Sequence, residues 1–153
     1  MVRVLVVEVY DVLRQSLLDL LGELPGVAVM GGVPNSAYAC VRIHREQIDV
    51  VILSTCQLSA RNLGSIQAMR QANPKAAVIV VGGETAPGYA QLAFRSGARG
   101  YVTRAHIVEE LGLAIQTVAR GEMYLARACS DGDFRGSDVI SRSSHLPKDP
   151  PLS

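Results

Sequence analysis

The sequence has no excess of charge of either sign, and it has few cysteines. Fifteen basic and fourteen acidic side chains give a net charge of +1 at pH 7, so no overall field favours nucleic acid or an anionic membrane as a partner. The three cysteines, Cys40, Cys56 and Cys129, form no CxxC pair and have no histidine nearby at metal-binding spacing. We therefore expect a reduced, cytoplasmic protein.

Long apolar runs are also missing. No segment stays apolar for the roughly 20 residues that a membrane-spanning helix needs. The first residues, MVRVLVVEVYDVLRQ, lack the basic, apolar and small-residue regions of a signal peptide. We expect neither export nor a membrane segment. At 153 residues and 48% apolar side chains, the chain is long enough for one sizeable core.

What the sequence does contain is a regular alternation of short β-branched runs with longer segments of helical period. The runs are apolar throughout, which is typical of parallel strands covered on both faces, and strict alternation requires helical crossovers. The pattern predicts a doubly wound, five-stranded parallel sheet in three α/β/α layers, of the flavodoxin type. The strand candidates are 2–8, 27–33, 49–53, 76–81 and 100–103, and the helix candidates are 13–21, 35–46, 61–72, 87–96 and 107–120.

The composition changes after Ala126. Residues 127–153 are rich in Ser, Asp, Arg and Pro, and their few apolar residues follow no period. Such a segment cannot bury enough surface to offset the ordering of its backbone. Its four acidic and four basic residues also argue against a DNA-binding arm. We predict one domain over 1–126 and a disordered tail over 127–153.

The carboxyl ends of the predicted strands locate a candidate site. In open parallel sheets, ligands bind outside these ends, where the strand order reverses. The third strand ends at Ser54, which therefore occupies the position of a catalytic residue. The residues delivered to the same edge by the other strands are Glu8 and Val9, Gly82, and Thr103 and Arg104.

Several stretches carry a family resemblance. The segments VRVLVVEVYDVLRQSLLDLL, AAVIVVGGE and above all SGARGYVTR resemble the CheY-like receiver domain of bacterial two-component response regulators, in the branch similar to NarL and FixJ. The resemblance covers 1–126. It implies phosphoryl transfer from a kinase histidine to an aspartate after the third strand, assisted by Mg²⁺. It also implies a hydroxyl residue after the fourth strand, a lysine after the fifth, and an aromatic residue that reports the change.

Carried over residue by residue, this pattern largely fails. The acceptor aspartate is replaced by Ser54, whose hydroxyl is a weak nucleophile without a base, and no histidine is delivered nearby. The resemblance therefore implies a pseudo-receiver with a degenerate phosphorylation site and with weak or absent Mg²⁺ binding. The remaining positions are Glu8 and Val9 for the acidic pair, Gly82 for the hydroxyl residue, Arg104 for the lysine, and Tyr101, which matches the aromatic.

Alternatives remain for two of these residues. Ser54 is open to phosphorylation by an unrelated kinase, and it is also open to a plain role in capping a local turn. Arg104 is open to binding an anion, but we expect it to form a partly buried ion pair with Glu8 that fills the empty metal pocket.

The expected function is that of an interaction module and not of an enzyme. A receiver without its phosphorylation chemistry needs a contact surface. We expect it between Ala90 and Gln116, where Leu113 should face away from the core, with the first helix as a second possibility. Tyr101 would anchor a partner there if its ring points outward. The expected partners are a second copy of the chain, another receiver or a histidine kinase.

Two further expectations concern nucleic acid and an alternative function. Regulators of the NarL type carry a helix-turn-helix domain after the receiver, whereas only 27 residues follow Ala126 here, so we expect no direct nucleic-acid binding. The alternative is a flavodoxin-like ligand-binding protein or enzyme that uses the same strand-end pocket.

Overall fold

The computed structural model describes residues 1–56, 58–83 and 87–130. A parallel sheet with the strand order β2-β1-β3-β4-β5-β6 lies at its centre. Its strands are β1 (Val2–Val7), β2 (Val27–Val33), β3 (Val50–Ser54), β4 (Ala77–Gly82), β5 (Gly100–Thr103) and β6 (Tyr124–Leu125).

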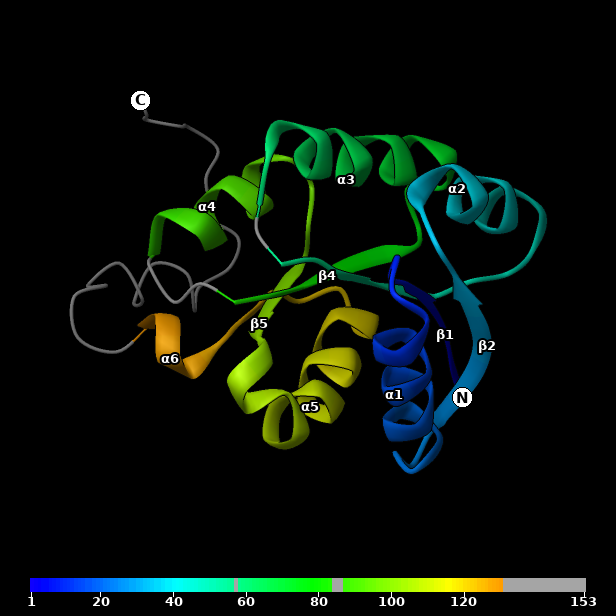
Figure 1. Ribbon diagram of the computed structural model, residues 1–153, viewed down its shortest axis with the longest axis horizontal. Helices are drawn as coiled ribbons and strands as arrows, with labels where there is room; N and C mark the ends of the chain where they lie inside the picture. The colour runs from blue at the N-terminus through cyan, green and yellow to red at the C-terminus, as the bar shows by residue number, and fades with distance from the viewer. Residues whose placement is uncertain (57, 84–86, 131–153) are drawn as a thin grey trace.

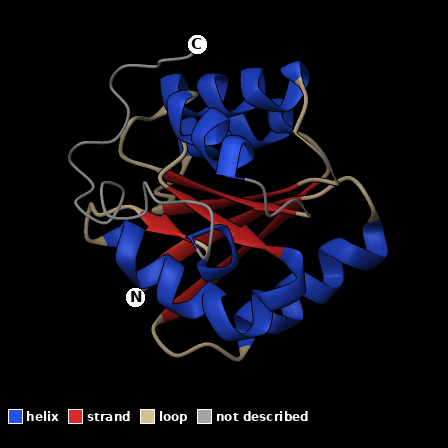
Figure 2. Ribbon diagram, turned by 90° about the vertical axis from the view of Figure 1, so that its left-hand side faces the viewer, coloured by secondary structure: helices blue, strands red, loops and turns tan. Residues whose placement is uncertain are grey.

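Helices cover both faces of the sheet, as Figures 1 and 2 show. The helices α2 (Ser36–Arg45), α3 (Ala60–Ala72) and α4 (Pro87–Arg95) lie on one face, and α1 (Asp11–Gly22) and α5 (Ile107–Ala119) lie on the other. A single 3₁₀ turn, Arg104–His106, precedes α5, and the short α6 (Arg127–Ser130) follows β6. The predicted three-layer α/β/α architecture with a parallel sheet is confirmed.

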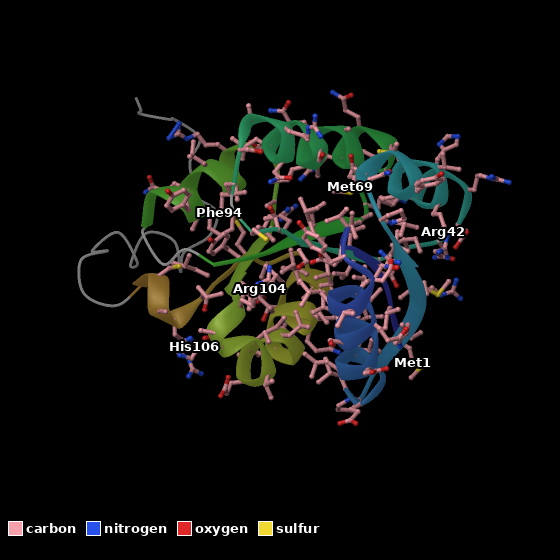
Figure 3. All side chains as sticks on the ribbon, viewed as in Figure 1. Met1, Arg42, Met69, Phe94, Arg104 and His106 are labelled. Atoms are coloured by element: carbon pink, nitrogen blue, oxygen red, sulfur yellow. The ribbon has the colours of Figure 1, made fainter. Side chains whose placement is uncertain are left out.

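The core has two layers because successive residues of a strand point to opposite faces. In β1, Val4 and Val6 pack with the layer beneath α1 and α5, whereas Leu5 and Val7 pack with the layer beneath α2, α3 and α4. Phe94 extends from α4 into the second layer (Figure 3). This double burial is the reason why the strands are apolar throughout and do not alternate with polar residues.

The sheet has six strands and not the five that the sequence predicts. β6 pairs in parallel with β5, with Gly100 opposite Tyr124 and Tyr101 opposite Leu125. The Ala126 N–H donates to the Tyr101 carbonyl over 2.8 Å. A two-residue strand is too short to show any periodicity, so the sequence pattern could not reveal it.

A buried carboxylate joins this extra strand to α5. Glu110 is almost fully buried, and its Oε1 accepts hydrogen bonds from the Tyr124 hydroxyl at 2.7 Å and from the Arg127 N–H at 3.3 Å. Ala126 and Cys129 are buried in the layer beneath α4. Residues 127–130 therefore form a packed helix, although they fall in the predicted tail, and the rest of that tail, 131–153, lies outside the described residues.

Among the described helices, none combines the length and the apolar character that crossing a bilayer requires.

Candidate functional site

A cavity opens at the carboxyl ends of β1 and β3, where the strand order reverses. Its volume is about 720 Å³. Residues 7–10 and 53–56 form its floor, and residues 34–37 together with 59, 61, 62 and 65 form its walls. The walls are the starts of α2 and α3, where Asn35 Oδ1 accepts from the Tyr38 N–H and Ser59 Oγ accepts from the Asn62 N–H. These caps satisfy backbone N–H groups in the first turn of each helix.

Glu8 and Ser54 form a hydrogen-bonded pair on the cavity floor. The Ser54 hydroxyl donates to Glu8 Oε1 over 2.5 Å, and the Tyr10 N–H donates to Glu8 Oε2 over 3.0 Å. The exposed fractions are only 3% for Glu8 and 7% for Ser54. Both carboxylate oxygens thus have a donor in a region largely closed to water, which is how a buried carboxylate is stabilised.

The sequence alone predicted no base for Ser54, because no histidine follows a neighbouring strand. A carboxylate that accepts the Ser54 proton has the geometry of a base beside a nucleophile. The sequence placed both residues directly after strands, but only the register of β1 against β3, with Val7 opposite Leu53, brings their side chains together. Parallel neighbours deliver their next residues to one point.

The residues present do not fit the Mg²⁺ site that the resemblance implies. Mg²⁺ prefers near-octahedral oxygen ligands, with one or two carboxylates among them. Glu8 is already engaged by Ser54 and Tyr10, and Val9, which is 61% exposed, brings no side-chain oxygen. Within the described ranges, no group of three or more His, Cys, Asp or Glu side chains is placed to hold a metal ion.

The predicted ion pair between Glu8 and Arg104 is wrong. Arg104 Nη2 donates instead to the Thr55 carbonyl over 3.0 Å, and its position beside the sheet is shown in Figure 3. Neither Glu8 nor Arg104 takes part in any ion pair within the described part of the chain. The physical reason is that the Ser54 hydroxyl already supplies the donor that Glu8 needs, whereas Arg104 reaches the β3–α3 connection.

Gly82 and Tyr101 lie against each other at the end of β4. Tyr101 is 0% exposed, so its ring points inward and does not offer a partner the outward anchor that the sequence analysis considered. A β-carbon at position 82 would lie 2.6 Å from the Tyr101 hydroxyl oxygen. The tyrosine hydroxyl therefore fills the space that a side chain at position 82 would need.

We expect Ser54→Ala to lower the free energy of unfolding by about 2 kcal/mol, because it leaves one oxygen of a buried carboxylate without a donor. Denaturant unfolding of the native chain and of the Ser54→Ala variant measures this loss. The matched control is Ser65→Ala, which removes a neutral hydroxyl pair with Ser36 at 3.0 Å and should lower it by less than about 1 kcal/mol. Equal losses in the two variants would show that the Glu8 carboxylate does not depend on Ser54.

Comparisons with known proteins agree with this architecture. No protein-family model matches the chain. The response regulator GacA of Pseudomonas aeruginosa is 27% identical over 127 residues, which are 82% of this chain and 59% of that protein. The chain thus spans less than two thirds of the length of this curated relative.

Solved structures show the same fold. A LuxR-family two-component response regulator from Aurantimonas sp. SI85-9A1 superposes with a TM-score of 0.78 at 21% identity, over 90% of this chain and 97% of that one. A structure of two RcsB dimers bound to two parallel DNAs superposes with a TM-score of 0.70 at 14% identity, over 84% of this chain and 66% of that one. Both superpositions show that the chain shares the fold of these proteins.

Proposed function

We propose that this receiver domain is a degenerate member of bacterial two-component signalling, a pseudo-receiver that acts as an interaction module without phosphorylation and without Mg²⁺. The observation that carries the proposal is the buried hydrogen bond between Ser54 and Glu8. It occupies both the acceptor position and the one remaining carboxylate of the strand-end site. We propose no enzymatic activity for this site.

Phosphoryl transfer to this site lacks three of its requirements. The acceptor aspartate is replaced by Ser54, which has no carboxylate, so no acyl phosphate can form at this position. The developing charge needs a metal ion and hydrogen-bond donors around the phosphoryl group, but Val9 and Gly82 carry no polar side chain. The native chain should therefore incorporate no phosphate from acetyl phosphate or a phosphorylated histidine kinase with Mg²⁺ present. Stable phosphate in this cavity would contradict the proposal.

The contact surface of such a module lies on α1 and α5. Part of the surface expected between Ala90 and Gln116 is buried, since Ala90 and Phe94 lie in the core layer that also contains Ala126 and Cys129. Exposed apolar side chains remain on α5, where Val108 is 69% and Leu113 52% exposed, and on α1, where Val12 and Leu13 are exposed. Both helices cover the same face of the sheet (Figure 1). We call these four side chains the α1–α5 face.

Exposed apolar side chains on two helices that cover the same face of the sheet are candidates for contact with a partner. We propose that a second copy of this chain, or another receiver, binds the α1–α5 face, and that a histidine kinase is a further candidate partner. The dimers named in the RcsB structure support an assembly of this type.

The test is association in solution. Leu113→Glu should raise the dissociation constant of the native dimer by about tenfold or more, because it places a charge in a desolvated contact. Sedimentation over a range of concentrations measures this. Leu92→Glu is the matched control, since Leu92 is exposed on α4, across the sheet from α5. A strict monomer at every concentration, or an equal effect of both variants, would remove this face from the proposal.

A second candidate function follows from the cavity. A volume of about 720 Å³ lies in the range of small-molecule sites, and the walls carry Arg61 beside several hydroxyl groups. A flavodoxin-like ligand-binding protein would use this space. The variant Ala37→Trp should fill part of the cavity, because Ala37 lies on its lining. A small molecule that raises the melting temperature of the native chain, but not that of Ala37→Trp, would favour this second candidate.

A further inference from the structure

Gly82 is the residue that allows Tyr101 to lie where it does. A β-carbon built at position 82 would be 2.6 Å from the Tyr101 hydroxyl oxygen, 3.2 Å from Cζ and 3.4 Å from Cε1. A separation of 2.6 Å is far inside van der Waals contact. Any residue other than glycine at position 82 therefore competes with the tyrosine ring for the same space.

The register of β4 against β5 explains why Tyr101 reaches Gly82. Tyr101 of β5 lies opposite Val80 of β4, and Gly82 lies opposite Thr103. Because residues two apart on a strand point to the same face, Val80, Gly82 and Tyr101 share one face, and the long tyrosine side chain reaches from the level of Val80 to that of Gly82. The hydroxyl is thereby placed at the carboxyl end of β4.

The rest of the ring is enclosed by the C-terminal extension and α4. Tyr101 packs in the same core layer as Phe94, Ala126 and Cys129, and Leu125 of β6 lies opposite it in the sheet. β6 thus closes the edge of β5, and α6 brings Cys129 into the layer that contains the ring. The ring has core atoms on its flanks, and its hydroxyl fills the space that a side chain at position 82 would need.

We propose that Gly82 and the β6–α6 segment hold Tyr101 in one buried orientation, so that the end of β5 is fixed in a single state whatever occupies the strand-end cavity. The inference rests on the proposed function, because it explains how a receiver domain keeps one contact surface without a phosphorylation signal. In this proposal, the end of β5 stays in one state because Gly82 has no side chain.

The orientation of the ring is measured directly in chain labelled with 3-fluorotyrosine. The chain has five tyrosines, and the signal that disappears in Tyr101→Phe identifies Tyr101. With a soluble paramagnetic agent, the ¹⁹F relaxation enhancement of Tyr101 should be several-fold smaller than that of Tyr38, which is exposed. In Gly82→Ala the Tyr101 value should rise toward that of Tyr38.

A neighbouring glycine provides the control. Among the described residues, the nearest atom to a β-carbon at Gly83 would be Cys56 O at 3.7 Å, which is an ordinary separation. Gly83→Ala should therefore leave the Tyr101 signal unchanged. An equal rise in both variants would overturn the proposal, and so would a Tyr101 signal that stays protected in folded Gly82→Ala.

The double variant, Gly82→Ala with Tyr101→Phe, covers the case in which Gly82→Ala alone does not fold. Tyr101→Phe removes the atom at 2.6 Å and leaves Cζ at 3.2 Å as the nearest contact, so Gly82→Ala combined with Tyr101→Phe should regain a melting temperature close to that of Tyr101→Phe alone. Failure of this rescue would overturn the proposal. All these readouts are taken without phosphate or partner, so phosphorylation of the native chain with a protected Tyr101 would refute the proposed function alone.

Discussion

A chain that carries both Ser54→Asp and Val9→Asp should take up phosphate from acetyl phosphate in the presence of Mg²⁺, whereas the native chain takes up none. The double change provides an acceptor carboxylate and a second acidic residue beside Glu8, and Val9 lies on the cavity lining. Mg²⁺ then has hard oxygen ligands from two strand ends. Radiolabelled phosphate or intact-mass analysis measures the product.

Ser54→Asp alone is the informative control. Ser54 Oγ lies 2.5 Å from Glu8 Oε1, so an aspartate there puts two carboxylates in one buried place and one of them is forced to bind a proton. We expect a lower melting temperature that Mg²⁺ partly restores, and phosphate uptake about tenfold or more slower than in the double variant, because metal ligation is incomplete. Equal uptake in the single and double variants would mean that position 9 supplies no ligand.

Glu110→Ala should release the β6–α6 segment from the domain. Glu110 Oε1 receives the Tyr124 hydroxyl and the Arg127 N–H, and removing a buried acceptor that is shared by two donors should lower the free energy of unfolding by about 3 kcal/mol. Burial, followed by the charge of Glu110, raises the pKa of the Cys129 thiol to about 11. In the native chain at pH 8, this thiol is therefore almost entirely protonated.

Thiol labelling follows the release of the segment. Only the thiolate reacts, so a Cys129 that returns to an ordinary pKa of about 8.5 should label about two hundredfold faster at pH 8. Peptide mass analysis separates Cys129 from the exposed Cys56, whose labelling rate is the internal reference. Glu110→Gln, which keeps an acceptor oxygen, should label more slowly than Glu110→Ala. Unchanged labelling in Glu110→Ala would show that the segment packs without the carboxylate.

The location of the candidate site follows from the sequence because it depends only on the strand ends. The run at 2–8 becomes Val2–Val7, and Glu8 is the next residue. The helix predicted over 107–120 is observed as Ile107–Ala119, with Leu113 on its exposed side. These predictions use periodicity alone, and periodicity reports which side of an element is buried.

The identity of each side chain's partner does not follow in the same way. The strand ends place Glu8, Ser54 and Arg104 at one edge of the sheet, and their charges alone predict a pair of Glu8 with Arg104. In the structure, Glu8 binds Ser54 instead. A hydrogen bond requires a separation correct to a few tenths of an ångström, and the separation depends on the register of β1 against β3, which no local pattern contains.

The sequence by itself thus determined the parallel α/β architecture and the edge of the sheet at which polar residues gather, because apolar periodicity and strand order act over whole elements. Only the tertiary structure decided three finer features. The first is β6, whose two residues gain their place from β5 and from Glu110. The second is the Ser54–Glu8 pair, and the third is the inward ring of Tyr101. Each depends on contacts between residues distant in sequence, where a single atom too many, such as a β-carbon at position 82, changes which side chain fits.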